Sequence, residues 1–342
     1  MPMGYAYLSG EHPQVPHEEL RGSLEAEGAR YRELLRLDQL VVLEVDSLAG
    51  LARAVERSAY SREGGEALAM SELGDVGPLA EGFRALRERG VARVQVRVER
   101  VKGSIEPGEA VEIQRELVKA ARLAGLDVDP LAETLVKAYA SEGAVVLGLV
   151  SAKRSLGDVR ARSPPNRPFW RSGELDLLLS RALVNMSRMR RGDVFLDPFC
   201  GTGTIAIEAH LIGASRALCL DADPSMVSGA LANARSLGCQ LLVAQEDSMA
   251  MPLRDGSVDS IATDPPYGRS TRAPGGYEAV VRGFLREAAR VLREGGYVVF
   301  AGPADERPYR LALEEGFAVV ARMDQFVHSG MTRQIVVAKR TA

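Results

Sequence analysis

The sequence has few cysteines, and their spacing does not suit a metal site. Cys200, Cys219 and Cys239 are the three cysteines among 342 residues, and no two of them form a CxxC pair. Such spacing disfavours a zinc site or a disulfide framework, and it favours a reducing cytoplasm as the location. We therefore expect all three thiols to be small buried apolar groups.

Long apolar runs and a dominant sign of charge are missing too. No stretch approaches the roughly 20 residues that span a bilayer. The N-terminal "MPMGYAYLSG" lacks the charged start and apolar stretch of a secretory signal, so neither a membrane anchor nor export is expected. The net charge of −3 excludes a uniformly basic nucleic-acid-binding protein, while 46% hydrophobic residues leave ample material for a core.

The positive charge that is present gathers in one segment. Between Lys153 and Arg191 there are ten basic residues against three acidic ones. Such a local excess attracts phosphates even when the whole chain is acidic, or it keeps a linker solvated.

The first half of the chain reads as mixed α/β structure. "QLVVLEVDS" predicts a strand, and the helix that follows has Ser47 as a possible cap. "VARVQVRVERV" alternates as a half-buried strand does, and a later helix is expected to end at Gly125. We expect a ferredoxin-like domain over residues 1–60, a second α/β domain over 61–155, and a proline-rich linker over 156–172.

The second half, residues 173–342, alternates strand and helix. This order predicts a doubly wound, mostly parallel sheet with helices on both faces. In "FLDPFCGTGTIAIEA" a strand ends at Asp197, and Gly201 and Gly203 lie in the turn before a helix. The phosphate-binding glycine motifs do not match, and Asp197 would repel a pyrophosphate. The turn therefore suits an adenosine ligand with a positive or zwitterionic tail, or it is only a structural turn.

Acids follow the next two strands of this half. Asp221 ends "LCLD", about 20 residues past the glycines, where a carboxylate commonly binds the ribose hydroxyls. Asp223, before Pro224, is the alternative there, or it caps a helix. Asp247 follows the third strand, where it suits an adenine amino group or is a solvated turn acid.

In order along the chain, these features resemble those of the S-adenosylmethionine-dependent methyltransferases over residues 165–342. The resemblance implies a Rossmann-like class I methyltransferase fold, with the glycine loop holding the methionine part, Asp221 the ribose and Asp247 the adenine. The implied cofactor-binding residues are Asp197, Phe199, Gly201, Gly203, Thr204, Asp221, Ala222, Asp247, Ser248 and Asp264.

The resemblance also implies a role for the segment "SIATDPPYGRS". In this class, Asp-Pro-Pro-Tyr after the fourth strand marks methylation of an exocyclic amino group on a base. The resemblance implies that Asp264 and the carbonyl of Pro265 accept hydrogen bonds from the amino group. The rigid Pro265 and Pro266 fix the carbonyls, and Tyr267 stacks on the base, with Gly268 leaving space.

Three segments narrow the resemblance: "RPFWRSGELDLLLSRALVNMSRMRRGDVFLDPFCGTGTIAIEAHLIGA", "TDPPYGRST" and "VHSGMTRQIVV". They look like the archaeal THUMP-domain tRNA methyltransferases that act on N2 of guanine 10, which makes 61–155 a THUMP RNA-binding domain. Another tRNA or rRNA guanine, a DNA amino-methyltransferase and a non-catalytic tRNA-binding protein are the alternatives. The roles of Thr332 and Arg333 stay open, and Trp170 is expected in the core.

The resemblance also implies the partners. We expect a cytoplasmic monomer that binds tRNA and S-adenosylmethionine, with no metal and no membrane. The residues expected to contact RNA are Lys153, Arg154, Arg160, Arg162, Arg167, Tyr267 and Arg269.

Overall fold

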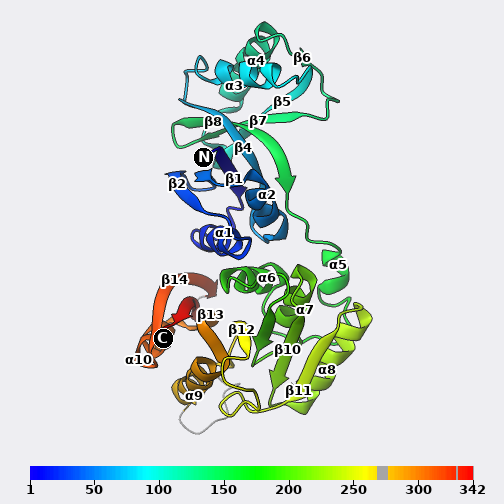
Figure 1. Ribbon diagram of the computed structural model, residues 1–342, viewed down its shortest axis with the longest axis vertical. Helices are drawn as coiled ribbons and strands as arrows, with labels where there is room; N and C mark the ends of the chain where they lie inside the picture. The colour runs from blue at the N-terminus through cyan, green and yellow to red at the C-terminus, as the bar shows by residue number, and fades with distance from the viewer. Residues whose placement is uncertain (268–275, 329, 342) are drawn as a thin grey trace. The chain divides into compact units, whose positions relative to one another are not determined.

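The computed structural model describes residues 1–267, 276–328 and 330–341. The chain forms two compact units, the first from Met1–Pro16 and Glu27–Ser155, and the second from His17–Ala26 and Leu156–Ala342. Each unit is a mixed α/β structure, so the expected fold class is confirmed (Figure 1). None of the helices in the described ranges is long and apolar enough to cross a membrane.

The first unit is built on an eight-stranded sheet of order β2-β3-β1-β4-β8-β7-β5-β6. Its core joins Phe83, Leu117 and Leu147, which come from two helices and a strand. The strands are β1 (Met3–Leu8), β2 (Tyr31–Arg36), β3 (Leu40–Val45), β4 (Ser61–Glu72), β5 (Arg93–Arg100), β6 (Asp127–Val128), β7 (Leu135–Ser141) and β8 (Ala144–Lys153). The helices are α2 (Leu48–Arg57), α3 (Leu79–Glu88), the short η1 (Val101–Gly103) and α4 (Pro107–Leu123).

Two local signals in this unit are confirmed. The Ser47 hydroxyl accepts a hydrogen bond from the backbone N–H of Gly50 at 3.1 Å, and it caps α2. Gly125 follows α4 with φ +83°, the left-handed conformation that ends many helices. Strand β4 pairs with β1 on one side and β8 on the other, so one sheet contains strands of both predicted N-terminal domains. Their division near residue 60 stays a prediction.

The second unit is built on a seven-stranded sheet of order β11-β10-β9-β12-β13-β15-β14. The strands are β9 (Val194–Asp197), β10 (Arg216–Asp221), β11 (Leu241–Gln245), β12 (Val258–Thr263), β13 (Leu292–Pro303), β14 (Phe317–His328) and β15 (Met331–Arg340). The helices are α1 (Val15–Ala26), α5 (Val159–Arg162), α6 (Leu177–Met186), α7 (Thr204–Ile212), α8 (Pro224–Ser236), α9 (Gly276–Val291), η3 (Ala304–Glu306) and α10 (Pro308–Glu314).

The direction of winding in this sheet reverses between β9 and β12. From β9 the chain runs outward through β10 and β11, and it then returns to add β12 and β13 on the other side of β9. All five strands are parallel, and β15 and β14 complete the sheet with antiparallel pairing. Ligands of doubly wound sheets bind at the carboxyl ends of the strands beside such a reversal. The ends of β9 and β12 are therefore where a site is expected.

The core under this edge is aromatic and fixes α9 against the sheet. Phe284 of α9 packs edge to face against Phe300 of β13, with ring centroids 6.1 Å apart, and also against Phe199. Offset and edge contacts of this kind add to the burial of apolar area. The loop residue Phe199 is thereby attached to the same core as the strands.

Two sequence expectations in this unit were wrong. Cys200 and Cys219 form a disulfide, because β9 and β10 are adjacent and the loop after β9 turns back over β10. The backbone N–H of Cys200 donates to the carbonyl of Leu220 at 2.9 Å, which brings the two sulfurs together. Trp170 is 50% exposed and so is not a core residue, whereas Cys239 is buried as expected.

Candidate active site

Asp197 ends β9 as a buried carboxyl group. Its Oδ1 accepts hydrogen bonds from the Thr263 hydroxyl at 2.6 Å and the Phe199 backbone N–H at 3.3 Å. Its Oδ2 is buried and has no hydrogen-bond partner among the residues that the structure describes. Burial is the main reason that the pKa of Asp197 is raised to about 8, and the nearby carboxylates of Asp221 and Asp264 add to this effect.

The glycine loop turns tightly from Asp197 into α7. Gly201 and Gly203 have φ values of +50° and +84°, which glycine adopts without strain. A side chain at Gly203 would also meet the Cβ of Ala230 at 3.1 Å. Thr204 begins α7 directly after this turn. The loop is therefore shaped by glycine, and it places backbone N–H groups beside the end of β9.

Asp221 lies at the end of β10, next to this loop. Its carboxylate accepts hydrogen bonds from the backbone N–H groups of Gly201 and Asp223, both at 2.9 Å. Burial raises the pKa of Asp221 above its usual value. Asp223 caps α8 by accepting from the Ser225 N–H at 2.7 Å, which confirms the capping alternative for that residue. Ala222 is exposed between them, and a ribose contact by Asp221 stays a prediction.

The third acid is placed by a local turn. Asp247 is exposed after β11, and its Oδ1 accepts from the backbone N–H of Met249 at 2.9 Å. This bond is the turn geometry that the sequence left as the alternative to an adenine contact. Ser248 beside it is buried. The adenine contact of both residues stays a prediction.

Asp264 follows β12 directly, on the strand next to β9. Its Oδ1 is buried and has no partner within the described ranges of the chain. Burial raises its pKa to about 6, while the positive charge of Arg333 and a hydrogen bond with Tyr267 lower it. Pro265 is buried after it, and Pro266 and Tyr267 are half-buried. The buried carboxyl group of Asp197 and the half-buried one of Asp264 thus lie at the ends of adjacent strands.

The sequence left one neighbour of this group without a role. Arg333 of β15 donates to the Tyr267 hydroxyl oxygen from Nη2 at 3.0 Å and from Nε at 3.3 Å. The "HSGMTR" segment marked this arginine, but only the pairing of β15 with β13 and β14 brings it to Tyr267. The Tyr277 hydroxyl at the start of α9 is also buried, and no sequence signal identified it.

The predicted RNA-contacting residues have different surroundings. Arg162 is buried and pairs with Glu208 at 2.7 Å, and Arg167 is buried and donates to the Thr204 hydroxyl at 2.6 Å. These two side chains attach the linker to α7. Lys153 and Arg160 are exposed, Arg154 is half-buried and donates to the carbonyl of Ala59, and Arg269, like Gly268, lies outside the described residues.

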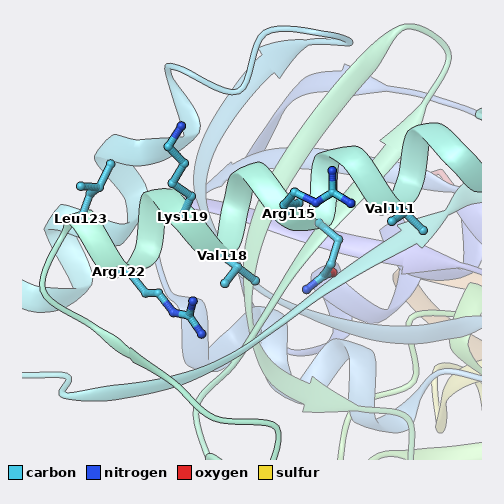
Figure 2. Close-up of a pocket in the computed structure, with 7 residues that line it drawn as sticks. Val111, Arg115, Val118, Lys119, Arg122 and Leu123 are labelled. Carbon is cyan, nitrogen blue, oxygen red and sulfur yellow. The ribbon is translucent and has the colours of Figure 1, made fainter.

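A shallow pocket on the first unit is lined by one face of α4. Its lining contains three basic side chains and no acidic one (Figure 2). The lining residues are Val111, Gln114, Arg115, Val118, Lys119, Arg122 and Leu123. No group of three or more His, Cys, Asp or Glu side chains in the described parts of the chain is arranged to hold a metal ion.

Comparison with known proteins gives matches over the second unit and over the whole chain. Residues 164–335 match the family model described as UPF0020, RMKL-like, methyltransferase domain. A tRNA (guanine(10)-N2)-dimethyltransferase of Methanothermobacter thermautotrophicus is 31% identical over 339 residues, which cover 97% of this chain and 98% of that protein. The protein of the same name from Methanocaldococcus jannaschii is 30% identical, with 99% of each chain covered. The crystal structure of TrmN from Thermus thermophilus shares the fold, with a TM-score of 0.52, 22% identity and 99% of each chain covered.

Proposed function

The chain belongs to the family of the tRNA (guanine(10)-N2)-dimethyltransferases, and from this premise we propose that it methylates the exocyclic N2 amino group of guanosine 10 in tRNA. S-adenosylmethionine is the proposed methyl donor. The observation that carries the proposal is the buried, unshared oxygen of Asp264 at the end of β12, beside the reversal in the sheet. Two methyl groups are proposed because both full-length relatives are named dimethyltransferases.

The residues at the end of β9 fit such a donor. The buried Oδ2 of Asp197 has no partner in the described part of the chain, and it suits an ammonium group, whose positive charge would lower the raised pKa of Asp197 and keep the carboxylate ionised. The glycine loop allows a ligand close to the backbone, and the half-buried Asp221 carboxylate suits a pair of ribose hydroxyls. The donor supplies an electrophilic methyl group on its sulfonium. The chain's own residues bind and orient it.

Asp264 is the proposed acceptor for the base. The N2 nitrogen of guanine is a weak nucleophile because its lone pair is conjugated with the ring. A hydrogen bond from the amino group to the free oxygen of Asp264, and a second to the carbonyl of Pro265, localise the lone pair and aim it at the methyl group. As N2 forms its bond to the methyl carbon, the bond from that carbon to the sulfonium sulfur breaks and its electron pair stays on sulfur. The proton leaves N2, and Asp264 accepts it. A pKa of about 6 leaves the carboxylate mostly ionised at neutral pH, as this role requires.

The substrate base must leave its stack before it reaches this site. Tyr267 is the proposed stacking partner, and the exposed Lys153 and Arg160 are the proposed phosphate contacts near the linker. The α4 face in Figure 2 is a further basic surface of the first unit. Buried Arg162 and Arg167 support the linker instead. A monomer and a cytoplasmic location complete the proposal, since tRNA is a cytoplasmic substrate.

The test is methyl transfer to a defined transcript. We expect the protein to label an unmodified tRNA transcript with guanosine at position 10 from methyl-labelled S-adenosylmethionine. Nuclease digestion and chromatography should identify N2-methylguanosine and N2,N2-dimethylguanosine. The matched control is the same transcript with inosine at position 10, which lacks only the amino group.

Label that persists on the inosine transcript, or that appears on another nucleoside, contradicts the proposed target. The Asp264→Ala variant tests the proposed role of Asp264. We expect it to lose transfer by roughly 100-fold or more, the scale of general-base catalysis, while its affinity for the methyl donor stays within about twofold. Full activity of this variant would exclude the role of Asp264 in proton acceptance.

A further inference from the structure

Arg333 joins two strands and the Asp-Pro-Pro-Tyr loop through one buried guanidinium. Its side chain is almost fully buried on β15. Nη2 and Nε both donate to the Tyr267 hydroxyl oxygen, at 3.0 and 3.3 Å, and Nη1 donates to Oε1 of Gln325 at 3.1 Å. Gln325 lies directly opposite Arg333 in the β14–β15 pairing. The guanidinium is therefore held by a neighbouring strand while two of its donors converge on one phenol oxygen.

This geometry restricts Tyr267 more than a single hydrogen bond does. The donors of a guanidinium lie in one plane at fixed angles, so two of them on one oxygen hold that oxygen in the guanidinium plane between Nε and Nη2. The Tyr267 hydroxyl also takes part in a hydrogen bond with Asp264. A tyrosine held at its hydroxyl by both Arg333 and Asp264 keeps its ring in one place beside the carboxylate.

We propose, on the basis of the proposed function, that Arg333 is a positioning residue that fixes the Tyr267 ring beside Asp264 and so orients the substrate base for methyl transfer. Arg333 touches neither substrate nor donor in this role. Its contribution reaches the reaction through the Tyr267 hydroxyl. Misplacement of an orienting side chain lowers the rate of the chemical step more than it lowers ligand affinity.

The charge of Arg333 has a second consequence that makes the proposal measurable. The groups that face Asp264 are Arg333 of β15, Tyr267 of its own loop, Tyr277 of α9 and Asp197 of β9. Arg333 is the cation among these four, and its charge lowers the pKa of Asp264. Removal of the charge should raise that pKa, so the acid limb of the activity profile moves to higher pH.

The experiment compares Arg333→Gln, Arg333→Lys, Tyr267→Phe and the double variant Arg333→Gln/Tyr267→Phe. We expect each single variant to lose on the order of tenfold in kcat, the scale of a charge-assisted hydrogen bond, with an unchanged Kd for the methyl donor. The double variant should be no slower than the slower single variant, because both remove the same contact. Arg333→Gln should shift the acid limb upward, whereas Arg333→Lys keeps the charge and should leave the limb in place.

The matched control is Arg322→Gln, which removes an exposed arginine of β14 that lies over the Tyr309 ring. It should leave kcat and the acid limb unchanged. Multiplicative losses in the double variant, or an acid limb that Arg333→Gln does not move, would overturn the proposal. A role of Arg333 in stability alone predicts an unchanged kcat and an unmoved acid limb in Arg333→Gln, with a lower melting temperature as the only effect.

A measurement without RNA separates this inference from the proposed function. The sequence has nine tyrosines, and in protein labelled with carbon-13 at tyrosine Cζ the signal lost in Tyr267→Phe identifies Tyr267. The chemical shift of the Tyr267 signal should change in Arg333→Gln. In a pH titration of this shift, the inflection that reports the ionisation of Asp264 should move to higher pH. An unchanged Tyr267 signal overturns the inference. An enzyme that labels no tRNA but shows the shifted signal refutes the proposed function and leaves the contact established.

Discussion

At the scale of single residues, the site is defined by carboxyl groups buried without a full set of partners. Asp197 and Asp264 each have one buried oxygen with no hydrogen-bond partner among the described residues. Burial raises the pKa of both, to about 8 and about 6. Unsatisfied buried acceptors destabilise a fold, so they persist where a ligand supplies the missing donor.

Asp197→Asn should stabilise the ligand-free protein, and the gain should depend on pH. The pKa of Asp197 in the folded protein is about 8, above its usual value of 3.8, so the folded state holds an extra proton between these pH values. Stability is therefore lost as pH rises through this window, because the unfolded carboxyl ionises first. Asparagine does not titrate, and since one pKa unit corresponds to about 1.4 kcal/mol, we expect it to raise the free energy of unfolding by several kcal/mol at pH 8 and by little below pH 4. Urea unfolding at both pH values measures the difference.

The control for this prediction is Asp305→Asn, which replaces an exposed carboxylate of η3. It should change the free energy of unfolding by less than about 0.5 kcal/mol at either pH. In the same Asp197→Asn protein the affinity for the methyl donor should fall, because the carboxylate proposed to bind its ammonium group is gone. If Asp197→Asn is no more stable than the wild type at pH 8, the ionisation of Asp197 costs the folded protein little free energy.

At the scale of elements, the sequence predicted the strand-turn-helix unit β9–α7. It did not predict the disulfide or the Arg333–Tyr267 contact that neighbouring strands form. An apolar run, an acid and two glycines identify the turn locally, and the structure has Gly201 and Gly203 in the left-handed conformations that this turn uses. The disulfide and the Arg333–Tyr267 contact depend on which strands are adjacent and in which register. Hydrophobic periodicity gives elements but not register, so these contacts had no local signal.

Gly203→Ala should damage both the start of α7 and the binding of the methyl donor. At φ +84° an alanine is strained by roughly 1–2 kcal/mol, and its Cβ would also meet the Cβ of Ala230 at 3.1 Å. We expect a loss of roughly 2–3 kcal/mol in the free energy of unfolding and at least about tenfold weaker binding by calorimetry.

Gly238→Ala is the matched control for Gly203→Ala. Gly238 has φ +67°, and a Cβ there would meet no atom within 4 Å, so this variant carries the backbone strain without the contact. It should lose only about 1 kcal/mol and bind the donor as the wild type does. Equal losses of stability and affinity in the two variants would mean that the close approach of Ala230 has no consequence.

At the scale of the whole molecule, composition and the order of elements predicted the α/β class and the doubly wound second half. They did not predict that α1 belongs with that half, although it precedes β2 by sequence. Arg188 is buried and pairs with Glu18 at 2.6 Å and with Glu25 at 3.0 Å, both from α1. The partners are separated by more than 160 residues. An ion pair between residues so far apart in the sequence produces no periodic pattern. The sequence therefore indicated a self-contained catalytic domain after the linker.

The fragment of residues 156–342 should therefore be less stable than the same region within the whole protein. Without residues 17–26 the buried Arg188 guanidinium loses both carboxylates, and removal of one side of a buried ion pair costs about 3–5 kcal/mol. We expect this fragment to melt well below the corresponding transition of the full chain in calorimetry.

The control is the same fragment with residues 15–27 joined to it by a flexible glycine-serine linker. If α1 supplies the missing partners, the joined form recovers most of the melting temperature, and Glu18→Gln/Glu25→Gln in that form removes the gain. Equal melting temperatures with and without α1 would mean that the catalytic domain begins at the linker, as the sequence indicated.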